Sequence, residues 1–284
     1  MGVMITMIFG AFIAGSSPEG SAAIAYPVFT LYLDIAPATA RNFAFAIQSF
    51  GMTAASIYIL NKKVPVDWKY IGFVIIGGVL GLIVGTQYVV PLVNPPVAKL
   101  LFVSLWLSFG ITLYRNNKNP HHEVRERLLH LTNRDLILLI TFGFLGGVIS
   151  SIFGTGINIF TFCLMVVYYH MNEKVAAASS IIIMTLETIL GFFLHRQVLN
   201  DFNQDSFNMW ICCIPLVIFM APLGSYVLSK ISRFQFANLL YSILFIQFMG
   251  AIWVIRPGWV LTLMSLGVIL IGVILFDVLS KLKA

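Results

Sequence analysis

The sequence predicts an all-helical protein that crosses a membrane many times. Apolar residues make up 59% of its 284 residues, and charged residues make up only 10%. Mean hydropathy is +0.94. A soluble domain carries about 25% charged residues, so this composition indicates a polytopic membrane protein. We attribute the net charge of +6 to membrane orientation rather than to nucleic-acid binding.

Apolar segments along the chain justify this fold class one by one. They are residues 2–16, 20–34, 37–60, 68–93, 96–115, 135–153, 156–171, 174–194, 209–229, 233–254 and 257–280. Most have the ~20 residues that a helix needs to cross a ~30 Å hydrocarbon core. The first two cover only ~22 Å at 1.5 Å per residue. We therefore expect these two, and the short segment 156–171, to be half-helices or re-entrant arms.

The polar stretch 116–134 divides the chain nearly in half. We predict a first transmembrane repeat over 1–115, a cytoplasmic polar loop over 116–134, a second transmembrane repeat over 135–255 and an extra C-terminal transmembrane helix over 256–284. An odd number of crossings in each half gives the two repeats opposite orientations, which makes them inverted repeats.

The distribution of basic residues tests this arrangement. With residues 61–69 and 116–134 on the cytoplasmic side, only four of the 17 Lys and Arg residues fall outside: Arg41, Lys99, Arg196 and Arg256. This skew obeys the positive-inside rule. It predicts a protein of the cell membrane with its N-terminus outside and its C-terminus in the cytoplasm.

Each half contains one break in an apolar run, at Ser16–Gly20 and at Gly154–Gly156. Backbone cannot break inside lipid unless protein or water satisfies its N–H and C=O groups. Paired breaks in corresponding places of two halves point to a transport site. A helix that restarts there presents unpaired N–H groups and a positive dipole end, which suit an anion. The alternative is that Gly and Ser only permit close helix packing.

Polar side chains at the breaks, and on the protein-facing stripes of segments 37–60 and 174–194, complete the candidate site. The candidate substrate-binding residues are Ser16, Ser17, Glu19, Gly20, Ser21, Arg41, Gln48, Gly154, Thr155, Gly156, Asn158 and Ser180.

Two carboxyl groups are candidates for coupling transport to protons, Glu19 and Glu187. Glu19 either caps a helix N-terminus or titrates during transport. Glu187 lies in a helix interior, where a lone charge is expensive, so it either functions in coupling or is a neutral group bonded to a neighbouring helix. Arg41 is either a fixed positive charge, with Glu187 or Asp34 as its partner, or a side chain that snorkels to the outer interface.

Several of these features form a pattern that extends over about residues 5–250. Its members are Ser16–Gly20, Pro27, Ala40-Arg41-Asn42, Asp67-Trp68, Gly77, Gly81, Gly85, Gly154–Gly156 and Ala176-Ala177-Ala178-Ser179-Ser180. In this pattern the chain resembles the sulfite exporter TauE/SafE family of membrane transporters. It departs from the family in its first break, which is diluted to Ser-Pro-Glu-Gly, and at Asn42-Phe43-Ala44, where the family has a Gly-Thr-Ser-like patch. The resemblance implies movement of small sulfur-containing anions, such as sulfite or organosulfonates.

We therefore predict a transporter of small anions that works by alternating access at a midplane site, with a lipid bilayer as its surroundings. Proton coupling is left open, and so is the oligomeric state. The alternatives are a passive anion channel, a non-transporting membrane scaffold and a cation transporter built on Glu19 and Glu187. We expect no enzyme activity and no cofactor. We expect no metal, because His121, His122, Glu123 and His130 lie in a polar loop typical of a solvated surface.

Overall fold

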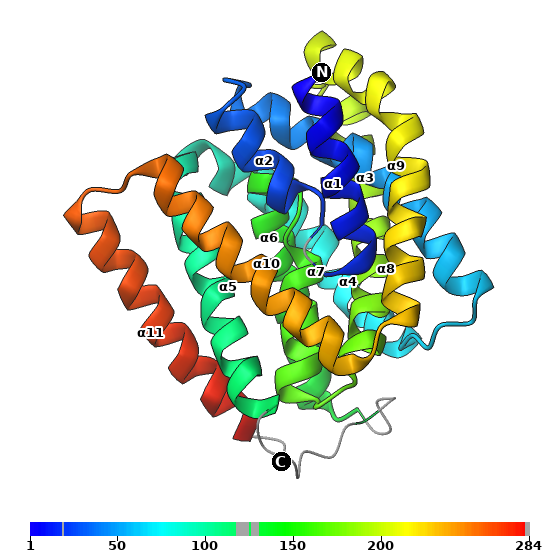
Figure 1. Cartoon of the computed structure of the whole chain (residues 1–284), viewed down its shortest axis with the longest axis vertical. Coiled ribbons are helices and arrows are strands. Elements are labelled where there is room, and N and C mark those ends of the chain that lie inside the picture. The colour runs from blue at the N-terminus through cyan, green and yellow to red at the C-terminus, as the bar shows by residue number, and fades with distance from the viewer. Residues whose placement is uncertain (19, 118–124, 126–130, 282–284) are drawn as a thin grey trace.

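The computed structural model describes residues 1–18, 20–117, 125 and 131–281, and these residues fold into helices (Figure 1). The α-helices are α1 (Gly2–Ser16), α2 (Ala22–Leu31), α3 (Pro37–Asn61), α4 (Trp68–Val84), α5 (Pro95–Asn117), α6 (Asn133–Phe153), α7 (Ile157–Cys163), α8 (Glu173–Phe193), α9 (Gln204–Lys230), α10 (Arg233–Ile255) and α11 (Trp259–Lys281). Within the described ranges, eight helices are long and apolar enough to cross a membrane. The predicted all-helical polytopic membrane protein is confirmed.

Three helices are too short to cross a bilayer. α1 has 15 residues, α2 has 10 and α7 has 7. α7 continues through one π-helical turn, Leu164–Tyr168. At 1.5 Å per residue, α1 spans ~22 Å and α2 ~15 Å, against a hydrocarbon core of ~30 Å. These lengths agree with the expected short arms on either side of the two breaks.

Side-chain caps set where several of the longer helices begin. The Asp67 side chain accepts the Tyr70 N–H at the start of α4, and Thr132 begins α6 with a capping box. The Asn203 side chain accepts the Ser206 N–H, so α9 begins at Gln204. This start lies five residues before the predicted apolar segment. Its first turn is polar, and hydropathy alone does not detect a polar turn.

Glycines bring two pairs of helices into backbone contact. A methyl group on Gly77 or Gly81 of α4 would collide with carbonyl oxygens of α6. One on Gly15 of α1 or Gly224 of α9 would collide with a carbonyl oxygen of the other helix. Such contacts, rather than hydrophobic burial, hold helices together in lipid. Glycines spaced four residues apart in an apolar segment predict close helix packing, and Gly77 and Gly81 of α4 pack in this way.

The helix contacts follow a two-fold pattern. α3 packs on α8, α1 on α9, and α4 on α6. When α1–α5 are matched in order with α6–α10, the α1–α9 pair corresponds to the α6–α4 pair. α11 lies at the edge of the bundle beside α5, and the start of α1 and the end of α11 lie at opposite ends of the bundle (Figure 1).

Candidate functional site

The two breaks contact each other in the interior of the bundle. Gly20 lies between α1 and α2 with φ +71°, and Gly154 ends α6 with φ +76°. Both values lie in the left-handed region, which favours glycine. A methyl group on Gly20 would lie 2.5 Å from Thr155 Oγ1 and 3.0 Å from Gln48 Oε1. Gly20 therefore brings backbone of the first break against side chains from the second break and from α3.

Asn158, in the first turn of α7, ties the breaks together. Its Nδ2 donates to the carbonyl oxygen of Pro18 in the first break. Its Oδ1 accepts from Thr155 Oγ1 and from the Gly156 N–H, both at 3.2 Å. Asn158 is 1% exposed. One buried amide thus bonds to both halves of the chain, which are more than a hundred residues apart in sequence.

Gln48 reaches the same place from the middle of α3. Its Nε2 donates to the Gly154 carbonyl at 2.9 Å and to the Ala44 carbonyl of its own helix at 3.0 Å. Its Oε1 is buried and has no hydrogen-bond partner in the described part of the chain. A buried acceptor without a donor is costly. Gln48 therefore leaves one acceptor available for a ligand that brings an O–H or N–H group.

Glu187 of α8 is fully buried. It lies next to Ser150, which bonds to the start of α7. Ser150 Oγ donates to its Oε2 at 2.8 Å and accepts the Ile157 N–H at 3.0 Å. Among the described residues, Oε1 has no hydrogen-bond partner, and no cation lies within ion-pair distance of this carboxyl group. Glu187 is thus joined to the start of α7 through a single hydroxyl group.

From the sequence we expected free N–H groups where α7 begins. In the structure the N–H groups of Gly156, just before α7, and of Ile157, its first residue, are both occupied. Asn158 occupies the Gly156 N–H, and Ser150 occupies the Ile157 N–H. Both acceptors are side-chain oxygens from the protein itself. Since neither residue combination forms a known capping motif in the sequence, the pairing became visible only in the folded chain.

Arg41, in the first turns of α3, pairs with Asp201 rather than with the predicted Glu187 or Asp34. Its Nη2 donates to Asp201 Oδ2 at 3.3 Å, and its side chain is 7% exposed. The alternative of snorkelling to the outer interface stays a prediction. Asp201 lies 160 residues away in the polar connection before α9, and only the packing of α3 against α8 and α9 brings the two together.

Two further residues complete the cluster around Asp201, and sequence reasoning missed both this carboxylate and His195. His195 Nδ1 lies 2.8 Å from Asp201 Oδ1, and Asn42 Nδ2 donates to the Asp201 backbone carbonyl at 3.0 Å. We call Arg41, Asn42, His195 and Asp201 the Arg41 cluster. It fastens the start of α3 to the connection that follows α8.

The remaining predicted residues are buried around the breaks, but three of their hydroxyl groups bond to their own helices. Ser16 and Ser17 Oγ donate to the Ile13 carbonyl, and Ser180 Oγ donates to the Ala177 carbonyl. Ser21 is 2% exposed. Glu19, the first of the two predicted coupling residues, lies outside the described residues.

Lys99 is a third residue that sequence reasoning missed, because it was counted only as an outer basic residue. It belongs to α5 and is 3% exposed. Its Nζ lies 5.9 Å from the ring centre of Tyr26, 5.5 Å from that of Phe102 and 5.7 Å from that of Phe153. Phe153 directly precedes Gly154, so a buried cation stands beside the second break, in contact with aromatic faces.

Comparison with known proteins agrees with the resemblance. The sequence model of the family described as sulfite exporter TauE/SafE matches residues 3–251, which include both breaks, the Arg41 cluster and Lys99. No curated protein and no solved structure gives a significant match to the chain.

Proposed function

Because the chain belongs to the sulfite exporter TauE/SafE family, we propose that it transports a small sulfur-containing anion, sulfite or an organosulfonate, by alternating access. Members of this family are transporters rather than enzymes. The proposed transport site is the region between the two breaks, at the centre of the bundle. It includes the residues named from the sequence other than Arg41, together with Ser150 and Lys99.

The observation that carries the proposal is the contact of Gly20 with Thr155 and Gln48. The contact joins the first half of the chain to the second at two irregular backbone segments. Irregular backbone at membrane depth is tolerated where it is buried in protein or lines a cavity, and such segments hold substrates in many transporters. A rocking movement of one half against the other would separate and rejoin these segments.

Backbone N–H groups at the second break supply the hydrogen-bond donors for an oxyanion. The N–H groups of Gly156 and Ile157 are held by Asn158 and Ser150. We propose that sulfite or sulfonate oxygens take the place of these side-chain acceptors in the loaded state, because N–H groups at a helix start favour an anion. We propose that Lys99 provides the formal positive charge beside the second break, where its buried ammonium group contacts three aromatic rings.

Of the two candidates for proton coupling, Glu187 is the one that lies within the described residues. It receives one neutral hydrogen bond, from Ser150, and that same hydroxyl group accepts the Ile157 N–H. Ionisation of Glu187 would place an uncompensated charge in the bundle interior, so exchange of its proton changes the charge next to the substrate donors. We propose that Glu187 gains and loses a proton during transport. Glu19 keeps the same proposed role from the sequence.

The proposed orientation has the N-terminus outside and the C-terminus in the cytoplasm of a cell membrane protein. Inverted repeats are part of the same proposal, and the exchange of the α1–α9 and α4–α6 contacts supports them. The positive-inside skew supports the orientation. Under it, the Arg41 cluster belongs to the outer side.

Uptake into proteoliposomes tests the proposed function. Sulfite, sulfate, thiosulfate and a two-carbon sulfonate are each offered with and without a pH gradient. We expect saturable uptake of sulfite or of the sulfonate that exceeds uptake of sulfate. Uptake that does not saturate would indicate a passive channel, and no uptake of any of the four would indicate a scaffold. Either outcome contradicts the proposal.

A substitution at Glu187 tests the coupling step. Glu187→Gln keeps the size of the side chain and an acceptor for Ser150, and it removes the titrating group. We expect uptake that no longer responds to a pH gradient. Asp277→Asn is the control, because Asp277 of α11 pairs with Arg115 at the end of α5, away from the breaks, and it should keep the native response. An unchanged response in Glu187→Gln would exclude this role for Glu187.

A further inference from the structure

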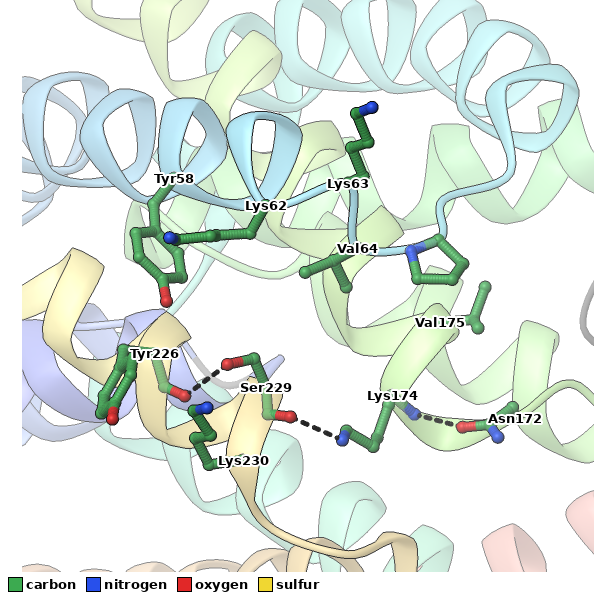
Figure 2. A pocket seen from close by; sticks show the side chains of 11 residues that line it. Tyr58, Lys62, Lys63, Val64, Asn172, Lys174, Val175, Tyr226, Ser229 and Lys230 are labelled. Carbon is green, nitrogen blue, oxygen red and sulfur yellow. Dashed lines mark hydrogen bonds between the residues drawn. The ribbon is translucent and has the colours of Figure 1, made fainter.

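A hollow lined by lysines opens at the end of the bundle opposite to the Arg41 cluster. Its cavity volume is about 470 Å³, and it lies among the end of α3, the start of α8 and the end of α9 (Figure 2). We call it the lysine pocket and define it by six of its lining residues: Tyr58, Lys62, Lys63, Lys174, Tyr226 and Lys230. The ends of three helices that are distant in sequence supply these side chains.

The charge of the lysine pocket is not neutralised by the described residues around it. Four lysines line it, and no carboxylate does so among the described lining residues. Lys174 Nζ donates to the Ser229 carbonyl at 3.1 Å, and Lys230 Nζ lies 5.7 Å from the ring centre of Tyr226. Lys62 and Lys63 are exposed at the end of α3. Like charges gathered around one hollow repel each other, and an anion bound between them relieves that repulsion.

The size and position of the lysine pocket indicate what kind of anion it takes. A water molecule occupies about 30 Å³, so 470 Å³ leaves room for a phosphate group and for more of the molecule that carries it. Tyr58 and Tyr226 meet edge to face, with ring centres 6.5 Å apart. Tyrosines are typical of the headgroup level of a membrane. Basic pockets between membrane helices at that level bind phosphate-bearing headgroups.

We propose that the lysine pocket binds a phosphate monoester or inorganic phosphate anion at the membrane surface, supplied by an anionic lipid headgroup or by a soluble phosphate. Lys62 reaches it from the end of α3, and Lys174 and Lys230 reach it from α8 and α9, while the Lys63 ammonium group points away from these three lysines (Figure 2). The bound anion ties together the ends of three helices, two of which, α3 and α8, also form the proposed transport site. The binding itself is independent of which anion the protein transports.

Direct binding measurements on the purified full chain test this inference. The lipid arm uses short-chain phosphatidic acid, with short-chain phosphatidylcholine, which is zwitterionic and has no net charge, as the comparison, and the soluble arm uses inorganic phosphate. The pocket variant is Lys62→Gln with Lys230→Gln. Lys174 is left intact, because it also holds the Ser229 carbonyl. The matched control is Lys69→Gln with Arg134→Gln, which removes the same charge from two exposed positions at the starts of α4 and α6.

We expect phosphatidic acid to bind the pocket variant about 30-fold more weakly than the native protein, since each basic residue contributes about 1 kcal/mol at a membrane surface. The control variant should stay within about threefold of the native affinity, because exposed charges outside a pocket are screened by salt. Binding in the lipid arm alone assigns the pocket to a headgroup, and competition by inorganic phosphate assigns it to a soluble anion.

Three results would overturn the inference. The first is a native affinity in the pocket variant, and the second is an equal loss in the pocket and control variants. The third is equal binding of phosphatidylcholine and phosphatidic acid. Thermal unfolding of both variants, without any ligand, separates a loss of binding from a loss of fold.

Discussion

The two ends of the α3–α8 pair carry basic side chains in opposite situations. At one end, Arg41 is 7% exposed and is held by Asp201. At the other end, Lys62 and Lys63 are exposed beside a hollow of about 470 Å³. At the first end the Asp201 carboxylate pairs with the arginine. At the second end, lysines line the hollow, and no carboxylate lies among the described lining residues. The difference shows that basic residues which look alike in a charge count have different structural roles.

On the proposed alternating-access mechanism, this contrast corresponds to one state of the cycle. Under the proposed orientation, the bundle is closed toward the outside by the Arg41 cluster and hollowed toward the cytoplasm at the lysine pocket. The two breaks lie between these ends. The predictions below test whether the two ends differ as much as the structure indicates.

The largest expected effect is in the chemical accessibility of the two ends of α9. Ser206 is fully buried near the Arg41 cluster, where its Oγ donates to the Thr39 carbonyl, and Ser229 lines the lysine pocket. Each is replaced by Cys in a Cys212→Ser background, because Cys212 is the exposed native cysteine. A negatively charged thiol reagent should modify Ser229→Cys at least ~10-fold faster, since the lysines attract it. Equal rates would contradict the contrast.

A smaller effect is expected from removing the carboxylate of the Arg41 cluster. Asp201→Asn leaves the Arg41 charge buried without its partner. The Asp201 side chain is 40% exposed, so solvent screens part of the interaction. We expect the free energy of unfolding to fall by about 1–2 kcal/mol, as for a hydrogen bond to a charged group. Chemical denaturation in detergent measures it.

The control for this substitution is Asp205→Asn, which changes an exposed aspartate in the first turn of α9. It should cost less than about 0.5 kcal/mol. If both variants lose the same amount, the Arg41 cluster does not fasten this end.

The smallest effect is expected from the lysine pocket in the absence of ligand. Lys62 makes no ion pair within the described residues. Lys62→Gln should therefore change the free energy of unfolding by less than about 0.5 kcal/mol, in either direction. Chemical denaturation in the same detergent measures this change. A loss above about 1 kcal/mol would mean that the pocket is neutralised from within the protein.

Much of the fold followed from the sequence, because hydropathy and segment length respond to the same bilayer that shapes the helices. The apolar segments and the short arms agree with the helices observed, and spaced glycines on α4 predicted its close contact with another helix. The start of α9 was placed too late, because a capped polar turn has no hydropathy signal.

The sequence predicted less of the site, because its contacts join residues that are far apart. Asp201 is 160 residues from Arg41, and no local pattern marks such a pair. Lys99 and the residues of the lysine pocket were read only as signals of membrane orientation. Their burial or convergence depends on how the helices pack, which hydropathy does not report. The breaks were the exception, since backbone irregularity inside an apolar run is visible in the residue types themselves.

The most direct test of the central claim is sulfite uptake by a Gly20→Ala variant in proteoliposomes. Its methyl group would lie 2.5 Å from Thr155 Oγ1 at a backbone φ of +71°, so the two breaks must move apart. Gly250→Ala is the matched control, because nothing lies within 4 Å of the added methyl group. We expect Gly20→Ala to fold, as judged by gel filtration and thermal unfolding, and to lose at least ~10-fold in saturable uptake, while Gly250→Ala keeps the native rate. Native uptake by folded Gly20→Ala would contradict the claim that the two breaks form the transport site.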